Sequence, residues 1–393
     1  MKRREFIQAG ISLTAFTDCS FGRYNHRDNA LKKVFEPIKI GNITIPNRIV
    51  FPPISTNYAD DEGFVTQRII NFHKHIAEGG IGLSVVGATP VRKDGKMLTN
   101  MQMLDDDRYI EGFGQLFETI KQNGSIACIQ LIYSGRQTSS TVIGEQPVAA
   151  SPIPYPGAKE TPRELSVQEI KQLVDCFSEA AYRAKMTGAD MIELNCSGGY
   201  LISGFLSPFS NKRTDKYGGS IENRTRFVRE ILEETRKKVG KNYPICCKIG
   251  ANEFIDGGIT IVESRENAQI LVDSGVDVIS VSAGVYGPRY SGIPTKEQGR
   301  RCYAYLAREI KDTVDVPVIG LGNILDLTDA EIVLQDGDAD MTAIGRALIA
   351  DPYLISKTKQ GKVEEINYCI QCRKCINTVH TPEGMNCSVN ENL

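Results

Sequence analysis

The sequence has no run of 18 or more apolar residues, no excess of either charge and no tryptophan. A membrane-spanning helix is therefore not expected. Lys and Arg number 46 against 48 Asp and Glu, which gives a net charge of −2 without a basic stripe or an acidic run, so a nucleic-acid partner is not expected either. With 393 residues, of which 41% are hydrophobic, the chain is long enough to bury a large core as a globular protein.

The N-terminal segment, residues 1–30, differs in character from the rest of the chain. Arg3 and Arg4 are followed by Phe6 and then by a short, mildly apolar run that ends at Phe16. This order is similar to a twin-arginine export signal, a system that carries proteins already folded. We therefore expect a signal or tail here and a periplasmic location, with a basic tail on a cytoplasmic protein as the alternative.

From Arg48 onward, short apolar segments alternate with amphipathic segments of helical period. The expected strands begin at Arg48, Gly82, Ser125, Met191, Pro244, Asp277, Val316 and Met341. Apolar runs without strict alternation are typical of parallel strands covered on both faces. Eight such α/β units predict a (β/α)8 TIM barrel over residues 31–361. An open doubly wound sheet is the main alternative, but the G-x-G-x-x-G stretch that commonly follows its first strand is absent.

One helix has a clear sequence signature. Ser166 and Glu169 form an expected capping box, and apolar residues follow at helical spacing from Val167 to Ala184. Gly188 is expected just past the end of the helix.

The residues that follow the last strands of a TM barrel face its active site. Here Gly320 and Gly322 follow the expected seventh strand, and the pair Gly345 and Arg346 follows the eighth. Backbone N–H groups and an arginine at this place predict a phosphate site, although glycines that only turn the chain are an alternative for any single loop.

Four of the eleven cysteines lie close together in residues 362–393. Cys369, Cys372, Cys375 and Cys387 have the spacing C-x2-C-x2-C-x11-C, which indicates a shared metal better than it indicates disulfides. Four thiolates suit an iron–sulfur cluster or zinc equally well. The other seven cysteines are dispersed, mostly in apolar settings, and are expected to be small buried side chains.

Several long segments together resemble one family. They are "FEPIKIGNITIPNRIVFPPISTN", "IQLIYSGR", "GYLISGFLSPFSNKRTDKYGGSIENRTRF" and "AIGRALIADP". These segments resemble the Old Yellow Enzyme family of FMN-dependent NADH:flavin oxidoreductases, in order from about Leu31 to the C-terminus. The cysteine spacing is similar to that of the branch with 2,4-dienoyl-CoA reductase and trimethylamine dehydrogenase, and this resemblance favours a 4Fe-4S cluster over zinc.

The resemblance also implies which residues contact FMN. The positions that match are Pro53, Ile54 and Ser55 after the first strand, Ala88 after the second, Gln130 at the pyrimidine edge, Lys248 near N1, and Gly322, Gly345 and Arg346 at the phosphate. Lys248 stands where the family usually has arginine. A cation there is expected to stabilise the reduced flavin, but as a point charge without the planar fork of arginine.

For catalysis, the resemblance implies that Tyr200 donates a proton to a carbon of the substrate. The family commonly has a pair of hydrogen-bonding side chains just before this tyrosine, and the matching residues here are Asn195 and Gly198. Asn195 keeps one hydrogen-bonding side chain and Gly198 has none. Tyr133 likewise stands where a histidine is common. Ordinary enone substrates are therefore not assumed.

These features predict an FMN-dependent oxidoreductase that reduces an activated C=C bond of a small molecule. Amine oxidation is one alternative, although the aromatic cage of such enzymes includes tryptophan, and a non-catalytic electron carrier is another. The sequence stops at Leu393 without a second nucleotide-binding domain. Electrons are thus expected from NAD(P)H directly or from a separate redox protein through the cluster. An export signal favours the separate redox protein as the electron donor.

Overall fold

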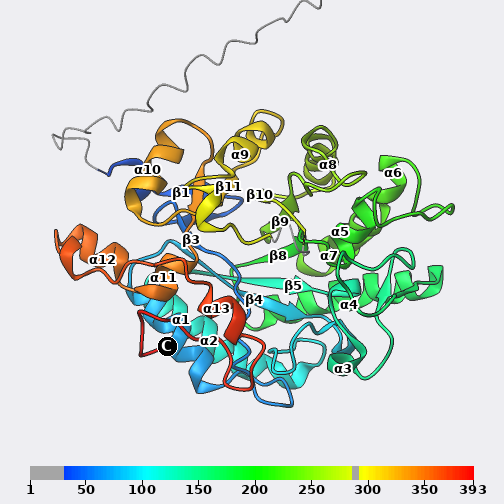
Figure 1. Cartoon of the computed structure of the whole chain (residues 1–393), viewed down its shortest axis with the longest axis horizontal. Coiled ribbons are helices and arrows are strands. Elements are labelled where there is room, and N and C mark those ends of the chain that lie inside the picture. Colours follow the sequence, from blue (N-terminus) through cyan, green and yellow to red (C-terminus); the bar gives the residue numbers. More distant parts are fainter. Residues whose placement is uncertain (1–30, 286–291) are drawn as a thin grey trace, which may run out of the picture. The chain divides into compact units, whose positions relative to one another are not determined.

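The computed structural model describes residues 31–285 and 292–393 (Figure 1). The predicted twin-arginine segment, residues 1–30, lies outside the described residues, so the export signal and the periplasmic location stay predictions. Leu31–Leu393 form one compact unit. The proposed division of that unit at residue 361 also stays a prediction.

Eight parallel strands form a closed barrel, which confirms the expected (β/α)8 fold. In barrel order the strands are β3 (Ile49–Phe51), β4 (Leu83–Pro90), β5 (Ile126–Ile132), β8 (Met191–Cys196), β9 (Ile245–Gly250), β10 (Val278–Ser282), β11 (Val318–Gly320) and β12 (Met341–Ala343), and β12 pairs with β3. Each strand lies within or next to the segment expected from its apolar run. The strands are almost wholly buried because the barrel interior covers one face and the helices cover the other.

Helices surround the barrel (Figure 1). The α-helices are α1 (Gln67–Glu78), α2 (Ile110–Gln122), α3 (Ser140–Ile143), α4 (Val167–Met186), α5 (Leu201–Leu206), α6 (Ile221–Arg224), α7 (Arg226–Val239), α8 (Ile261–Asp273), α9 (Ala304–Lys311), α10 (Leu327–Gln335), α11 (Arg346–Ala350), α12 (Leu354–Lys359) and α13 (Lys374–Thr378). Short 3-10 turns occur at η1 (Lys33–Phe35), η2 (Lys93–Gly95), η3 (Asp107–Tyr109), η4 (Gly135–Gln137), η5 (Lys296–Gln298) and η6 (Val363–Glu365). Among residues 31–285 and 292–393, no helix combines the length and hydrophobicity that crossing a bilayer requires.

Helix α4 begins and ends as its sequence indicates. The Ser166 hydroxyl accepts a hydrogen bond from the backbone N–H of Glu169 at 3.2 Å, and the Glu169 carboxylate accepts one from the backbone N–H of Ser166 at 2.8 Å. The helix ends at Met186, and Gly188 follows with a φ of +83°. Val167, which the helical spacing places with the apolar face, is exposed at the first turn.

A hairpin of β1 (Ile38–Ile40) and β2 (Ile43–Ile45) closes the amino-terminal end of the barrel, a feature that the sequence patterns did not predict. Ile40 and Ile45 pack against Leu83, Met191 and other first residues of the barrel strands. Burying an isoleucine side chain contributes about 1.5–3 kcal/mol, so two of them form a stable plug. The carboxyl ends of the strands remain for a binding site.

The cysteine-rich tail is fastened to the loop after β3. The backbone N–H of Met385 donates to the Thr56 carbonyl at 2.8 Å, and the Tyr58 hydroxyl donates to the Met385 carbonyl. Gly384 has a φ of +75°, and a Cβ atom there would lie 2.7 Å from the Thr56 carbonyl oxygen. Only glycine fits so close a contact, which brings residues 378–385 onto the carboxyl end of the barrel.

Candidate active site at the carboxyl end of the barrel

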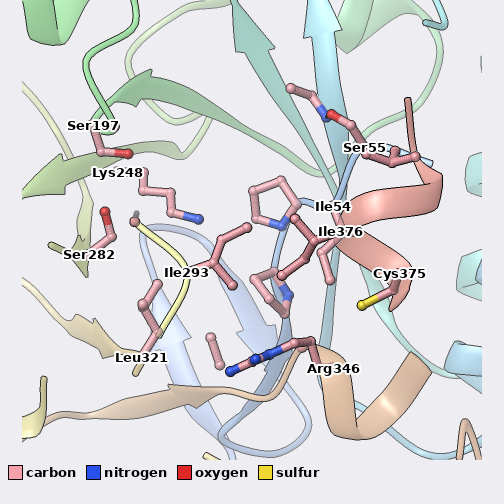
Figure 2. A pocket seen from close by; sticks show the side chains of 18 of the residues that line it. Ile54, Ser55, Ser197, Lys248, Ser282, Ile293, Leu321, Arg346, Cys375 and Ile376 are labelled. Atoms are coloured by element: carbon pink, nitrogen blue, oxygen red, sulfur yellow. The ribbon is translucent and has the colours of Figure 1, made fainter. Parts of the chain in front are cut away.

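A cavity of about 480 Å³ opens at the carboxyl ends of the strands, within the size range of small-molecule sites. Most of the barrel residues predicted from the sequence line it: Pro53, Ile54, Ser55, Ala88, Gln130, Asn195, Tyr200, Lys248, Gly322, Gly345 and Arg346. Gly320, which was also predicted near the phosphate, is the last residue of β11 and does not line the cavity. Figure 2 shows Lys248 reaching into this cavity from the barrel and Ile376 and Cys375 lying on α13 at its other side. The individual roles of these residues stay predictions, but the fold brings them to one place.

Arg346 forms a cationic end of the cavity (Figure 2). Its Nη2 donates to Asn323 Oδ1 at 2.8 Å, which fixes the guanidinium. Its Nη1 is buried and has no partner among the described residues. At the neighbouring Gly322, φ is +124°, and a Cβ would lie 2.8 Å from the backbone nitrogen of Tyr303. The free Nη1 of Arg346, next to a glycine whose backbone no side chain covers, fits a phosphate group.

A directed chain of hydrogen bonds crosses the cavity floor. The backbone N–H of Ser197, which can only donate, bonds to Asn195 Oδ1 at 3.1 Å. Asn195 Nδ2 therefore faces Gln130 Oε1 at 3.2 Å, and Gln130 Nε2 faces Glu193 Oε1 at 2.6 Å. Gln130 keeps one spare N–H and one spare lone pair, which matches the mixed donor and acceptor edge of a flavin pyrimidine ring.

Lys248 lies beside Asn195, because β8 and β9 pair these two residues directly. Burial lowers the pKa of the Lys248 ammonium from its usual 10.5, and the carboxylate of Glu193 opposes that shift. Burial likewise raises the pKa of Glu193. Within the described residues, the Lys248 ammonium has no hydrogen-bond partner, so its charge is available to a ligand.

Tyr200 precedes α5 and is 7% exposed. Its hydroxyl lies 3.2 Å from Met97 Sδ, and its ring packs with Ala88 and Leu98. Gly198 has a φ of +68°, and a Cβ there would lie 3.1 Å from Tyr200 Cε2. A side chain at position 198 would crowd the Tyr200 ring, so the glycine allows the ring to lie where it does.

Tyr133, which stands where the family commonly has histidine, does not line the cavity. Its hydroxyl donates to Asp94 Oδ2 at 2.6 Å and receives a bond from Arg92 Nη2 at 3.2 Å. Burial, with the Asp94 carboxylate second, raises the pKa of Tyr133 far above its usual 10.0. Tyr133 therefore fixes the loop that carries Met97 instead of exchanging protons with a substrate.

The tail supplies cavity residues that were not predicted. Ile376, Val379, His380 and Met385 lie between the third and fourth tail cysteines and line the cavity beside Cys375. Residues from barrel loops were also missed, and they include Gln137, Tyr155 and Ser197. The apolar pair Ile376 and Val379, three residues apart after Cys375, was the one available signal that this segment covers something.

The four tail cysteines line a second, small cavity of about 20 Å³. It shares Arg346, Ile349 and Cys375 with the large cavity. All ten cysteines in the described residues are free thiols. Burial raises the pKa of Cys375 to about 11, whereas a hydrogen bond with Ser388 lowers the pKa of Cys372. In the described part of the chain, no three His, Cys, Asp or Glu side chains are arranged as metal ligands. Four thiols around one cavity are the right donors for an iron–sulfur cluster, but in the described residues they are not arranged as metal ligands.

The cavity of this (β/α)8 barrel has at one end an arginine nitrogen that is buried without a partner among the described residues, and farther in it has a cation and an oriented amide. These groups suit a flat, phosphorylated cofactor. The chain belongs to the NADH:flavin oxidoreductase / NADH oxidase family, whose model matches residues 33–365. The resemblance to this family is confirmed.

The chain is 43% identical to an NADH oxidase of Thermoanaerobacter brockii over 86% of its own length and 52% of the relative's. It is 32% identical to a cinnamate reductase of Clostridium sporogenes, covering 91% of this chain and 57% of the relative. Among solved structures, 2-naphthoyl-CoA reductase in complex with 2-naphthoyl-CoA matches with a TM-score of 0.88 and 30% identity, over 92% of this chain and 57% of that one. The chain thus spans just over half the length of these relatives.

Proposed function

We propose that this protein reduces an activated C=C bond of a small molecule. The observation that carries the proposal is the meeting of Tyr200, Lys248 and Arg346 around one cavity. The similarity to a cinnamate reductase supports it, because cinnamate is an alkene conjugated to a carboxylate.

The chain's own groups suit FMN in this cavity. Arg346 Nη1 would bind the phosphate, Gln130 would pair with the pyrimidine edge, and Lys248 would face the ring where negative charge gathers on reduction. When bound, FMN supplies the hydride for the β-carbon of the alkene.

Tyr200 would hold the proton that the α-carbon receives. Its hydroxyl is positioned by Met97 Sδ at 3.2 Å, and its ring lies among Ala88, Leu98 and Met101. This packing holds the ring in place at the cavity, so the tyrosine hydroxyl would be a fixed proton source for a bound substrate.

The tail would hold a 4Fe-4S cluster through Cys369, Cys372, Cys375 and Cys387, and such a cluster would supply single electrons. Cys375 lines both cavities, so this residue would belong to the cluster site and to the wall of the flavin site. The electron donor is NAD(P)H, as the family name suggests, or a separate redox protein that reaches the exposed Cys372.

Amine oxidation is the less favourable function for this cavity. No Asp or Glu lines it among the described residues, whereas Lys248 and Arg346 do. An ammonium substrate would therefore find no carboxylate in this lining to pair with.

Separate measurement of the two half-reactions tests the proposal. Tyr200→Phe should leave reduction of FMN by dithionite unchanged and slow reoxidation by an alkene about 10²- to 10⁴-fold, the range for a lost general acid. Tyr155→Phe, which removes a hydroxyl from the same cavity, is the matched control and should slow neither step. Equal slowing of both steps by Tyr200→Phe would show that the residue holds the flavin or the fold, and no slowing would reject it as the proton donor.

A further inference from the structure

His380 is the one histidine of the described residues that lines the large cavity. His73 is buried against Ser84 at 3.2 Å, and His75 bonds with the Tyr353 hydroxyl at 2.9 Å on the outside of the barrel. The ring of His380 is exposed and has no hydrogen-bond partner within residues 31–285 and 292–393. Its hydrogen-bonding capacity is therefore unused by the fold.

Contacts on both sides of His380 fix its position. Val379 packs against the apolar cluster that contains Tyr200. Asn57 Nδ2 donates to the Thr381 carbonyl at 3.1 Å, and Asn57 Oδ1 accepts from the backbone N–H of Asn100 at 2.8 Å. The tail thus holds His380 at the part of the cavity where the Tyr200 ring packs.

Few side-chain hydrogen-bond donors remain at positions 195 and 198, the pair of residues that precedes Tyr200. Gly198 has no side chain, and Asn195 Oδ1 already accepts two bonds from Ser197. One N–H of Asn195 is used by Gln130, which leaves a single N–H. A substrate oxygen that must carry developing negative charge is better stabilised by two donors than by one.

We propose that His380 is a substrate-binding residue, which supplies from the tail the second hydrogen bond to the carbonyl or carboxylate oxygen of an α,β-unsaturated substrate. This inference rests on the proposed function. The cavity lining agrees with a substrate that presents an oxygen acceptor, because no acidic side chain lines it among the described residues.

The assignment also connects the two ends of the tail. The segment that carries His380 starts at Cys375 and ends at Cys387, so the same short stretch would contact the substrate and the cluster. Changes at the cysteines are then expected to alter alkene affinity as well as electron supply.

The test uses the FMN-loaded enzyme and two probes with one carbon skeleton, cinnamate and cinnamaldehyde. Their dissociation constants are read from the change in flavin absorbance, without turnover. For whichever probe the wild type binds, His380→Ala should raise the dissociation constant about 5- to 30-fold, the effect of one lost hydrogen bond. His380→Gln, which keeps an N–H donor, should recover part of the affinity, and the surface control His75→Ala should bind like wild type.

The outcomes separate the two proposals. If wild type binds and reduces an alkene but His380→Ala binds both probes equally well, His380 is not a substrate ligand while the proposed function stands. If wild type neither binds nor reduces either probe or other activated alkenes, the proposed function fails and the role of His380 with it. A loss restricted to cinnamate would assign His380 to carboxylates, and a loss restricted to cinnamaldehyde to neutral carbonyls, and either result supports the proposal. Unchanged melting temperatures exclude unfolding as the cause.

Discussion

Replacing Arg346 by alanine should weaken FMN binding about 10- to 150-fold. The guanidinium is held by Asn323 at 2.8 Å, so its buried Nη1 is already directed and loses little freedom when it binds a phosphate. A hydrogen bond to a charged group contributes about 1.5–3 kcal/mol, and each 1.4 kcal/mol is a tenfold change in the dissociation constant.

The assay is a titration of flavin-free protein with FMN, followed by quenching of flavin fluorescence. Arg346→Lys should lose less affinity than Arg346→Ala, because lysine keeps the charge but not the two-pronged donor. Arg301→Ala is the matched control, since Arg301 lies beside Asn323 in the chain's hydrogen-bond network but does not line the cavity. Unchanged affinity in Arg346→Ala, or an equal loss in Arg301→Ala, would refute the phosphate assignment.

Arg346 also lines the cysteine cavity, so iron content should be measured on the same samples. If Arg346→Ala lost iron but bound FMN normally, Arg346 would support the cysteine site instead of binding the phosphate.

Two further predictions concern the tail and the barrel floor. Anaerobically purified protein should contain four irons per chain with broad absorption near the flavin bands, and Cys372→Ser should lower the iron content; one zinc and no iron would contradict the cluster. Lys248→Met should remove a pH dependence of stability in flavin-free protein. Because the folded-state pKa of Lys248 is lowered from 10.5, the unfolded chain binds more protons between the two pKa values, and wild type should gain stability as the pH rises through that interval. Urea unfolding at a series of pH values tests this, and equal slopes in both proteins would contradict it.

The barrel was predictable because its strands are continuous apolar runs and its helices have helical spacing, patterns that are local in the sequence. The hairpin plug was not predictable, because Ile40 and Ile45 are unremarkable apolar residues until the barrel exists for them to close. Glu193 was missed for a related reason. It lies inside an apolar strand, and its partner Gln130 is 63 residues away, so its effect on the amide orientation depends on strand register.

The candidate site divides in the same way. Arg346 was found because strand ends converge in any barrel of this kind, whereas Ala88, which lies inside β4, was found through the resemblance to the family. His380 and Val379 were missed because nothing local to the tail says which surface it covers. That contact is fixed by Gly384 and Met385 against the loop after β3, which only the folded chain reveals.

Surface loops usually tolerate insertions and deletions. The segment between Cys375 and Cys387 is expected to be an exception, since Gly384 leaves no room for a side chain and Met385 bonds to Thr56 at 2.8 Å. A change of even one residue in its length would displace either the thiol of Cys387 or the wall of the cavity. Exchanging this segment at constant length is therefore a route to altered substrate range that leaves the barrel sequence untouched.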